Sequence, residues 1–166
     1  MRIHGVEHHL HRWDVSGEQL PLIALHGFTG SGADFGPLAQ RLGRTVVAPD
    51  LVGHGGTGVP DAPWSMAKVV ESVSLMVEAL GWERFGVLGY SMGGRIGFSL
   101  AATRPKGLTA LIGVGVSPGI LNASERAERV RADEALADRV LSLGAAGFLE
   151  EWSALPLIRT QRNIPE

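Results

Sequence analysis

The sequence contains no cysteine, which excludes disulfides and thiolate metal sites within this chain. It also lacks a charge bias: 15 basic residues stand against 17 acidic ones, and the basic residues are scattered. A surface for nucleic acid or for an anionic membrane is therefore not expected. No uninterrupted apolar run approaches the ~20 residues of a membrane-spanning helix. The first 15 residues have no apolar stretch typical of a signal peptide, so we expect a soluble cytoplasmic protein.

Four short apolar runs predict buried strands. They cover residues 21–25, 45–49, 85–90 and 108–114. Each run is continuous rather than alternating and is bounded by Gly, Pro or Asp, which is typical of parallel strands buried on both faces. Residues 2–15 are less distinct and are compatible with an antiparallel hairpin at the edge of the sheet.

Segments whose apolar residues recur with helical spacing lie between these runs. The clearest helix covers 65–81, with Ser65 as its N-cap and Gly81 at its end. A shorter one within 32–43 is predicted to have Asp34 as its cap and Pro37 in its first turn. A third, within 92–105, stops before the proline at its end. Because strands and helices alternate, we predict an α/β fold with a doubly wound, mostly parallel sheet.

The composition changes after residue 118. Residues 122–144 are strongly charged, with Asn122 as a predicted N-cap and Gly144 as a predicted end, and a shorter amphipathic stretch follows over 145–158. No further strand pattern appears. We therefore expect a core over 1–118 and a helical lid over 119–166.

A serine between two glycines marks the boundary between the third apolar run and the helix that follows it. Gly89, Ser91 and Gly93 satisfy the pattern Gly-x-Ser-x-Gly in the strand–turn–helix context of a nucleophile elbow. The serine oxygen would then lie at a helix N-terminus, where the dipole favours developing negative charge. Taken alone, the pentapeptide also fits a glycine-rich turn without chemistry.

Two further motifs follow the first and second apolar runs. In "LHGFTGS" (25–31), the loop would supply one main-chain N–H of an oxyanion hole, and the residue after the serine would supply the other. Phe28 and Met92 are therefore the expected donors, while His26 would tie the loop rather than transfer protons. The third motif is "DLVGHGGTG" (50–58).

These three motifs resemble those of the α/β-hydrolase superfamily. Within it, the chain resembles the 2-succinyl-6-hydroxy-2,4-cyclohexadiene-1-carboxylate synthase family of menaquinone biosynthesis, over essentially its whole length. That narrower resemblance rests on "LHGFTGS", "GYSMGGR", "SPGI", "SERAERVRADEALADRV", "FLEEWSALPL" and "TQRNIPE". It implies a carbon–oxygen lyase, without cofactor or metal, that eliminates pyruvate from a cyclohexene carrying several carboxylates. The sequence departs from the family at Val52, where proline is usual, and at Val114, where an acidic residue is usual.

A polycarboxylate substrate requires cations. Arg95 follows Ser91 by one helical turn and can face the same pocket. The resemblance also assigns Arg129 and Trp152 of the lid, and Tyr90 beside the serine, to substrate binding. Arg129 equally fits a solvated helix face, and Trp152 equally fits plain core packing.

Three histidines near the N-terminus invite a metal interpretation. These are His8, His9 and His11, and strand spacing would place His9 and His11 on one face. No carboxylate motif or cysteine accompanies them in the sequence, so we expect a surface strand and no metal.

Histidine is missing from the chain after Ser91, although the triad of this fold runs Ser, Asp, His. The only later aspartates, Asp133 and Asp138, lie in the charged segment, and His54 lies in a loop that turns the chain. The simplest interpretation is a chain without its C-terminal, triad-bearing part, inactive alone and completed by a missing segment or a second chain. Two alternatives stay open: a carboxylester hydrolase, and a non-catalytic protein that binds an anion or a partner through an exposed sheet edge.

Overall fold

The computed structural model describes residues 1–159. The chain divides into two compact units, Met1–Pro118 and Gly119–Glu166.

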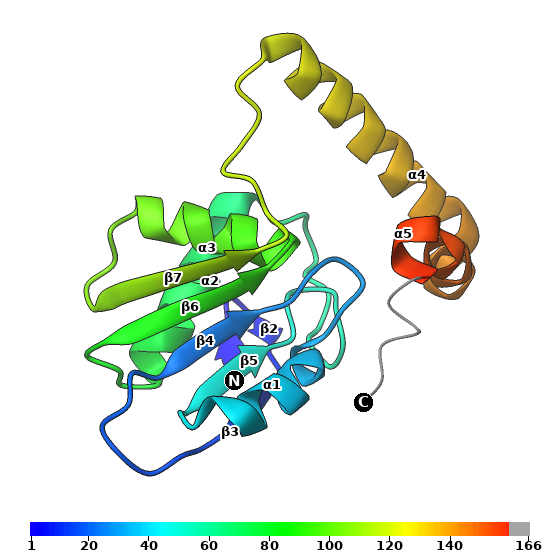
Figure 1. The fold of residues 1–166 in the computed structure, drawn as a ribbon. Coiled ribbons are helices and arrows are strands. Elements are labelled where there is room, and N and C mark those ends of the chain that lie inside the picture. Colours follow the sequence, from blue (N-terminus) through cyan, green and yellow to red (C-terminus); the bar gives the residue numbers. More distant parts are fainter. Residues whose placement is uncertain (160–166) are drawn as a thin grey trace. The chain divides into compact units, whose positions relative to one another are not determined.

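The first unit is built on a five-stranded sheet in the order β3-β5-β4-β6-β7 (Figure 1). The strands are β3 (Leu10–Trp13), β4 (Leu22–Leu25), β5 (Val46–Pro49), β6 (Phe85–Tyr90) and β7 (Leu108–Val114). Strands β4 to β7 run parallel, and β3 pairs antiparallel with β5. All four predicted apolar runs are strands, which confirms the mostly parallel α/β sheet.

The N-terminal segment forms more than the expected hairpin. Strands β1 (Arg2–Ile3) and β2 (Val6–Glu7) pair as a separate two-stranded sheet. The chain then joins the edge of the main sheet as β3, with Leu10 opposite Pro49. This pairing brings the start of the chain beside the end of β5.

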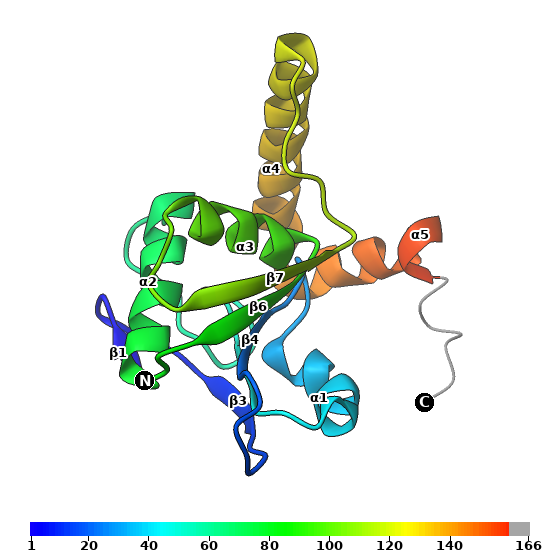
Figure 2. The same ribbon diagram turned by 60° about the vertical axis from the view of Figure 1, so that its left-hand side comes forward.

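Helices cover both faces of the sheet (Figure 2). Helices α2 (Met66–Ala79) and α3 (Met92–Ala102) lie on one face, and the 3-10 helix η1 (Gly32–Phe35) and helix α1 (Gly36–Leu42) lie on the other. Side chains of β4 alternate between two apolar clusters: Ile23 and Leu25 pack with α2 and α3, and Leu22 and Ala24 pack on the α1 side. The centre of the sheet is thus buried on both faces.

One predicted cap is confirmed and another is wrong. The Ser65 hydroxyl accepts the N–H of Lys68 at the start of α2. Asp34 is not the cap of α1, which begins at Gly36 with a proline in its first turn. The Asp34 carboxylate instead accepts the N–H of Ser31 at 2.9 Å. Its side chain thus closes the turn before α1, because the short 3-10 helix forms first.

Strand β7 departs from the prediction of burial on both faces. The side chains of Ile112 and Val114 are 52% and 48% exposed. Within residues 1–159, β7 pairs with β6 and has no strand on its other side. An apolar run does not by itself reveal whether a second strand covers it. The exposed edge does agree with the expectation of an exposed sheet edge after the fourth run, which rested on the lack of any later strand pattern.

The second unit is helical as far as it is described. Helix α4 (Ala123–Ala154) is capped by Asn122, whose side chain accepts the N–H groups of Ser124 and Glu125. Gly144 interrupts it with φ 67° and ψ 169°, at the predicted end of the charged helix. Helix α5 (Pro156–Arg159) follows. Neither unit contains, in its described part, a helix long and apolar enough to cross a membrane.

Candidate active site

Ser91 occupies a sharp turn between β6 and α3. Its backbone has φ 49° and ψ −109°, a region that non-glycine residues rarely adopt. The Ser91 N–H donates to the carbonyl of Val114 at 2.9 Å, which ties the turn to the end of β7. Strain of this kind persists only where the surrounding structure imposes it, and it is characteristic of functional sites. Strand, strained serine and helix follow one another as in a nucleophile elbow.

The two glycines of the motif lie where a side chain would collide with backbone. A Cβ on Gly89 would lie 2.6 Å from the carbonyl oxygen of Gly93. A Cβ on Gly93 would collide with the carbonyl group of Leu25 and would lie 2.7 Å from the oxygen of His26. The first turn of α3 therefore packs directly on the C-terminal end of β4, which brings the serine to the loop that follows β4.

That loop lies against the serine. A Cβ on Gly27 would lie 3.6 Å from the Cβ of Ser91 and 2.9 Å from the Cδ1 of Tyr90. Phe28 is the next residue along the loop. Met92, on the other side, is the first residue of α3, so its N–H has no partner within the helix. Both predicted main-chain donors thus adjoin Ser91 or the glycine that contacts it.

His26 ties two loops together, which confirms its predicted structural role. Its Nε2 accepts the N–H of Leu51 at 2.9 Å, so Nδ1 carries the proton and donates to the carbonyl of Gly27 at 2.8 Å. Burial lowers the pKa of His26, although the bond to the Gly27 carbonyl opposes this effect. Protonation would set an N–H of the ring against the N–H of Leu51, so the neutral ring is the one that the loops require.

Two buried histidines are expected to make the free energy of unfolding depend on pH. His8 is buried rather than exposed on a surface strand, and burial lowers its pKa as it does for His26. As pH falls below about 6.5, the unfolded chain takes up protons before the folded one. The free energy of unfolding should therefore decrease with falling pH, by up to about 1.4 kcal/mol per pH unit for each histidine. Urea unfolding between pH 8 and 5.5 measures this slope.

Replacing His8 tests whether this residue contributes to the pH dependence of the free energy of unfolding. Neither ring nitrogen of His8 has a hydrogen-bond partner among the described residues. His8→Leu should therefore reduce the slope without removing a bond. A stability that stays constant from pH 8 to 5.5 would contradict the assignment.

A carboxylate lies beside the N-terminal histidines, contrary to the expectation from the sequence. The side chain of Asp50, just after β5, accepts the N–H groups of Gly32 and Gly56 at 2.7 and 2.8 Å. Nδ1 of His9 and Nε2 of His11 each lie 3.1 Å from one of its oxygens. Burial would raise the pKa of Asp50, but these backbone and histidine hydrogen bonds hold it below its usual value. The buried carboxylate is therefore charged near neutral pH.

Tyr90 and Arg95 flank the serine on β6 and α3. The ring of Tyr90 covers Gly27 and lines a pocket of about 270 Å³. Its other lining residues are His26, Gly27, Asp34, Phe35, Leu38, Leu88 and Val114. Arg95 is exposed, and its backbone N–H donates to the carbonyl of Ser91 at 3.2 Å, one turn into α3. The pocket has a mainly apolar lining, and Arg95 is not among its lining residues.

Arg129 and Trp152 belong to the second unit. Nε of Arg129 lies 2.8 Å from both carboxylate oxygens of Asp133, on an exposed helix face. The ring of Trp152 stacks on that of Phe148 with centroids 5.6 Å apart. The structure thus assembles Ser91, Tyr90, Met92 and the Gly27–Phe28 loop, and it describes Arg129 and Trp152 only within their own unit.

Comparisons with known proteins agree with this geometry. The family model described as the alpha/beta hydrolase fold matches residues 21–158. A Bacillus subtilis (strain 168) protein, named provisionally as a 2-succinyl-6-hydroxy-2,4-cyclohexadiene-1-carboxylate synthase, is 33% identical over 148 residues. A Serratia proteamaculans (strain 568) protein with that name is 33% identical over 138 residues. The matches cover 87% and 82% of this chain but 54% of each relative, so the chain spans about half their length.

A solved structure of MenH from S. aureus superimposes with a TM-score of 0.81 at 27% identity. It covers 95% of this chain, which corresponds to 60% of that protein.

Proposed function

The chain belongs to the α/β-hydrolase fold family, and from this premise we propose that it carries part of a lyase site that releases pyruvate from a succinyl-cyclohexene carboxylate in menaquinone biosynthesis. The synthase names of the relatives support this reaction. The observation that carries the proposal is the strained Ser91, with the Gly27 loop against it and Arg95 one turn further along.

The proposed chemistry uses the serine as a base. Once the activating group has taken the hydroxyl proton of Ser91, the serine oxygen removes a proton from the carbon next to a conjugated carbonyl, and the electron pair moves onto the carbonyl oxygen. The N–H groups of Phe28 and Met92 stabilise this oxyanion. When the carbonyl re-forms, the C–O bond to the enolpyruvyl group breaks, and the departing oxygen takes the electron pair. The departing group is the enolate of pyruvate, which takes up a proton on carbon and becomes pyruvate.

The arginine side chains are proposed to bind the carboxylates of the substrate. A guanidinium can hold a carboxylate through two parallel hydrogen bonds, which suits a substrate with several carboxylates. Arg95 is proposed to make this contact from α3. Arg129 and Trp152 are proposed to contribute from the second unit, where Arg129 would exchange Asp133 for the substrate.

The group that activates Ser91 is proposed to come from outside these 166 residues. Every histidine in the sequence precedes Ser91, and both ring nitrogens of His26 are already hydrogen-bonded. The curated relatives are about twice as long as the matched region. A further segment or a second chain would supply the histidine and its acidic partner.

Replacing Arg95 tests whether the substrate is a polycarboxylate. For this test, residues 1–166 are joined to the C-terminal half of the Bacillus subtilis relative, and the product is called the completed protein. Arg95→Ala in this protein should lower kcat/KM for pyruvate release about 10–100-fold, as expected when a charged hydrogen bond is lost. Turnover of a neutral p-nitrophenyl ester should stay unchanged, and Arg95→Lys should recover part of the loss. An equal loss on both substrates would exclude the role of Arg95 as an anion clamp.

A further inference from the structure

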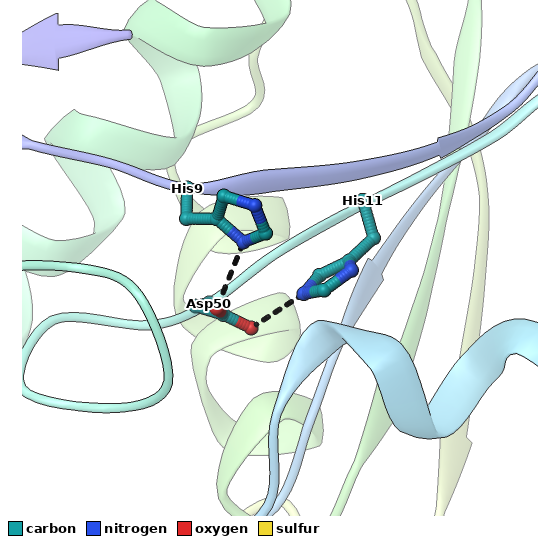
Figure 3. A group of neighbouring side chains, drawn as sticks. All are labelled: His9, His11 and Asp50. Carbon is teal, nitrogen blue, oxygen red and sulfur yellow. Dashed lines mark hydrogen bonds and ion pairs between the residues drawn. The ribbon is translucent and has the colours of Figure 1, made fainter.

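His9, His11 and Asp50 converge at the edge of the sheet, away from the serine motif in sequence. His11 lies on β3 and His9 immediately precedes this strand. Leu10, between them, pairs with Pro49, the residue before Asp50. Since alternate residues of a strand point the same way, both imidazoles face the carboxylate. Figure 3 shows the two rings pointing to the Asp50 side chain, His11 from β3 and His9 from the position just before this strand.

The distances suit a shared cation. Nδ1 of His9 and Nε2 of His11 each lie 3.1 Å from an oxygen of Asp50, and the three ligand atoms all lie within 4.8 Å of one another. Ligands about 2.1 Å from a tetrahedral ion are about 3.4 Å apart. Small rotations of the two imidazoles would therefore replace their hydrogen bonds with coordination.

The carboxylate is held independently of the histidines. The N–H groups of Gly32 and Gly56 each donate to one of its oxygens, and the side chain is only 2% exposed. Hydrogen bonds of this kind fix and orient a ligating carboxylate in metal sites. Asp50 would thus keep its position when the imidazoles turn to an ion.

The site is open on one side. The side chain of His9 is 52% exposed, which gives an ion a path from solvent. Three protein ligands leave at least one position for water. Two imidazoles with one carboxylate, in a chain without cysteine, are a donor set for divalent first-row transition metals rather than for calcium or magnesium.

We propose that His9, His11 and Asp50 form a binding site for one divalent transition metal ion, with zinc as the probe. The ion would join β3 to the loop that begins at Asp50. Because it would bind the folded chain, it should raise the thermal midpoint as its concentration increases.

Calorimetric titration of the 166-residue chain with ZnCl₂ at pH 7.5 tests this site. We expect one equivalent to bind, and His9→Ala and His11→Ala each to weaken the affinity at least about 10-fold, since even outer-shell partners of a metal contribute 10–100-fold. The matched control is His4→Ala, because His4 is a neighbouring histidine that pairs with Glu71. Its affinity for zinc should equal that of the wild type.

A second measurement needs no variant. Histidine side-chain NMR of the wild-type chain should show the nitrogen signals of His9 and His11 shifting with zinc, while those of His4 stay in place. Binding that is absent, that survives both alanine variants in folded protein, or that shifts His4 instead would overturn the proposal.

Discussion

Replacing Ser91 with alanine is expected to lower pyruvate release by the completed protein about 10²–10⁴-fold, the usual contribution of a positioned general base. Alanine keeps the Cβ and therefore the strained backbone, so the free energy of unfolding should change by less than about 0.5 kcal/mol. Loss of turnover without loss of stability would assign the effect to the hydroxyl group.

Ser91→Gly is the matched control for the strain. Glycine adopts φ 49° without penalty, so this variant should be about 1 kcal/mol more stable than Ser91→Ala, although equally inactive. Urea unfolding and a coupled assay for pyruvate compare the two. An alanine variant that keeps a tenth or more of the wild-type rate would show that another group is the base.

Gly93→Ala should have the largest effect on folding. Its Cβ would collide with the carbonyl of Leu25, which belongs to β4 and pairs with Gly89 of β6. The backbone of Leu25 cannot shift without disturbing its pairing with β6. We expect destabilisation by about 3 kcal/mol or more, at the upper end of overpacking effects.

Gly97→Ala, one turn further along α3, is the control for this effect. Its Cβ would lie 2.9 Å from Cδ1 of Leu111 and 3.1 Å from Cγ1 of Val87, the ends of side chains that can rotate. The free energy of unfolding should therefore fall by less than in Gly93→Ala. Chemical denaturation measures both variants, and a greater loss in Gly97→Ala would contradict the tight packing of α3 on β4.

The sheet could be predicted because its central strands are continuous apolar runs that neighbours cover on both faces. The same pattern failed for β7, whose composition matches that of the other strands while Ile112 and Val114 are exposed. Burial depends on a neighbour that the run itself does not encode. The prediction of Asp34 as the cap of α1 failed for a local reason. Its carboxylate accepts the N–H of Ser31 in the turn before α1 begins.

The serine motif could be predicted because its parts are close in sequence and its glycines follow from sterics. The Asp50 cluster could not, since its histidines lie 41 and 39 residues away along the chain. Antiparallel pairing of β3 with β5 brings them together. One sequence signal could have predicted the cluster. His9 and His11 alternate on a segment that can pair with the apolar run ending just before Asp50.

The ratio of elimination to ester hydrolysis tests the central proposal most directly. The completed protein is given the succinyl-cyclohexene carboxylate and, separately, a neutral p-nitrophenyl ester, and products are followed by NMR and absorbance. The account predicts pyruvate and the ring diene in equal amounts, at a kcat/KM well above that for the ester and dependent on Ser91. Ester turnover that exceeds pyruvate release, or a folded protein that releases no pyruvate, would contradict it.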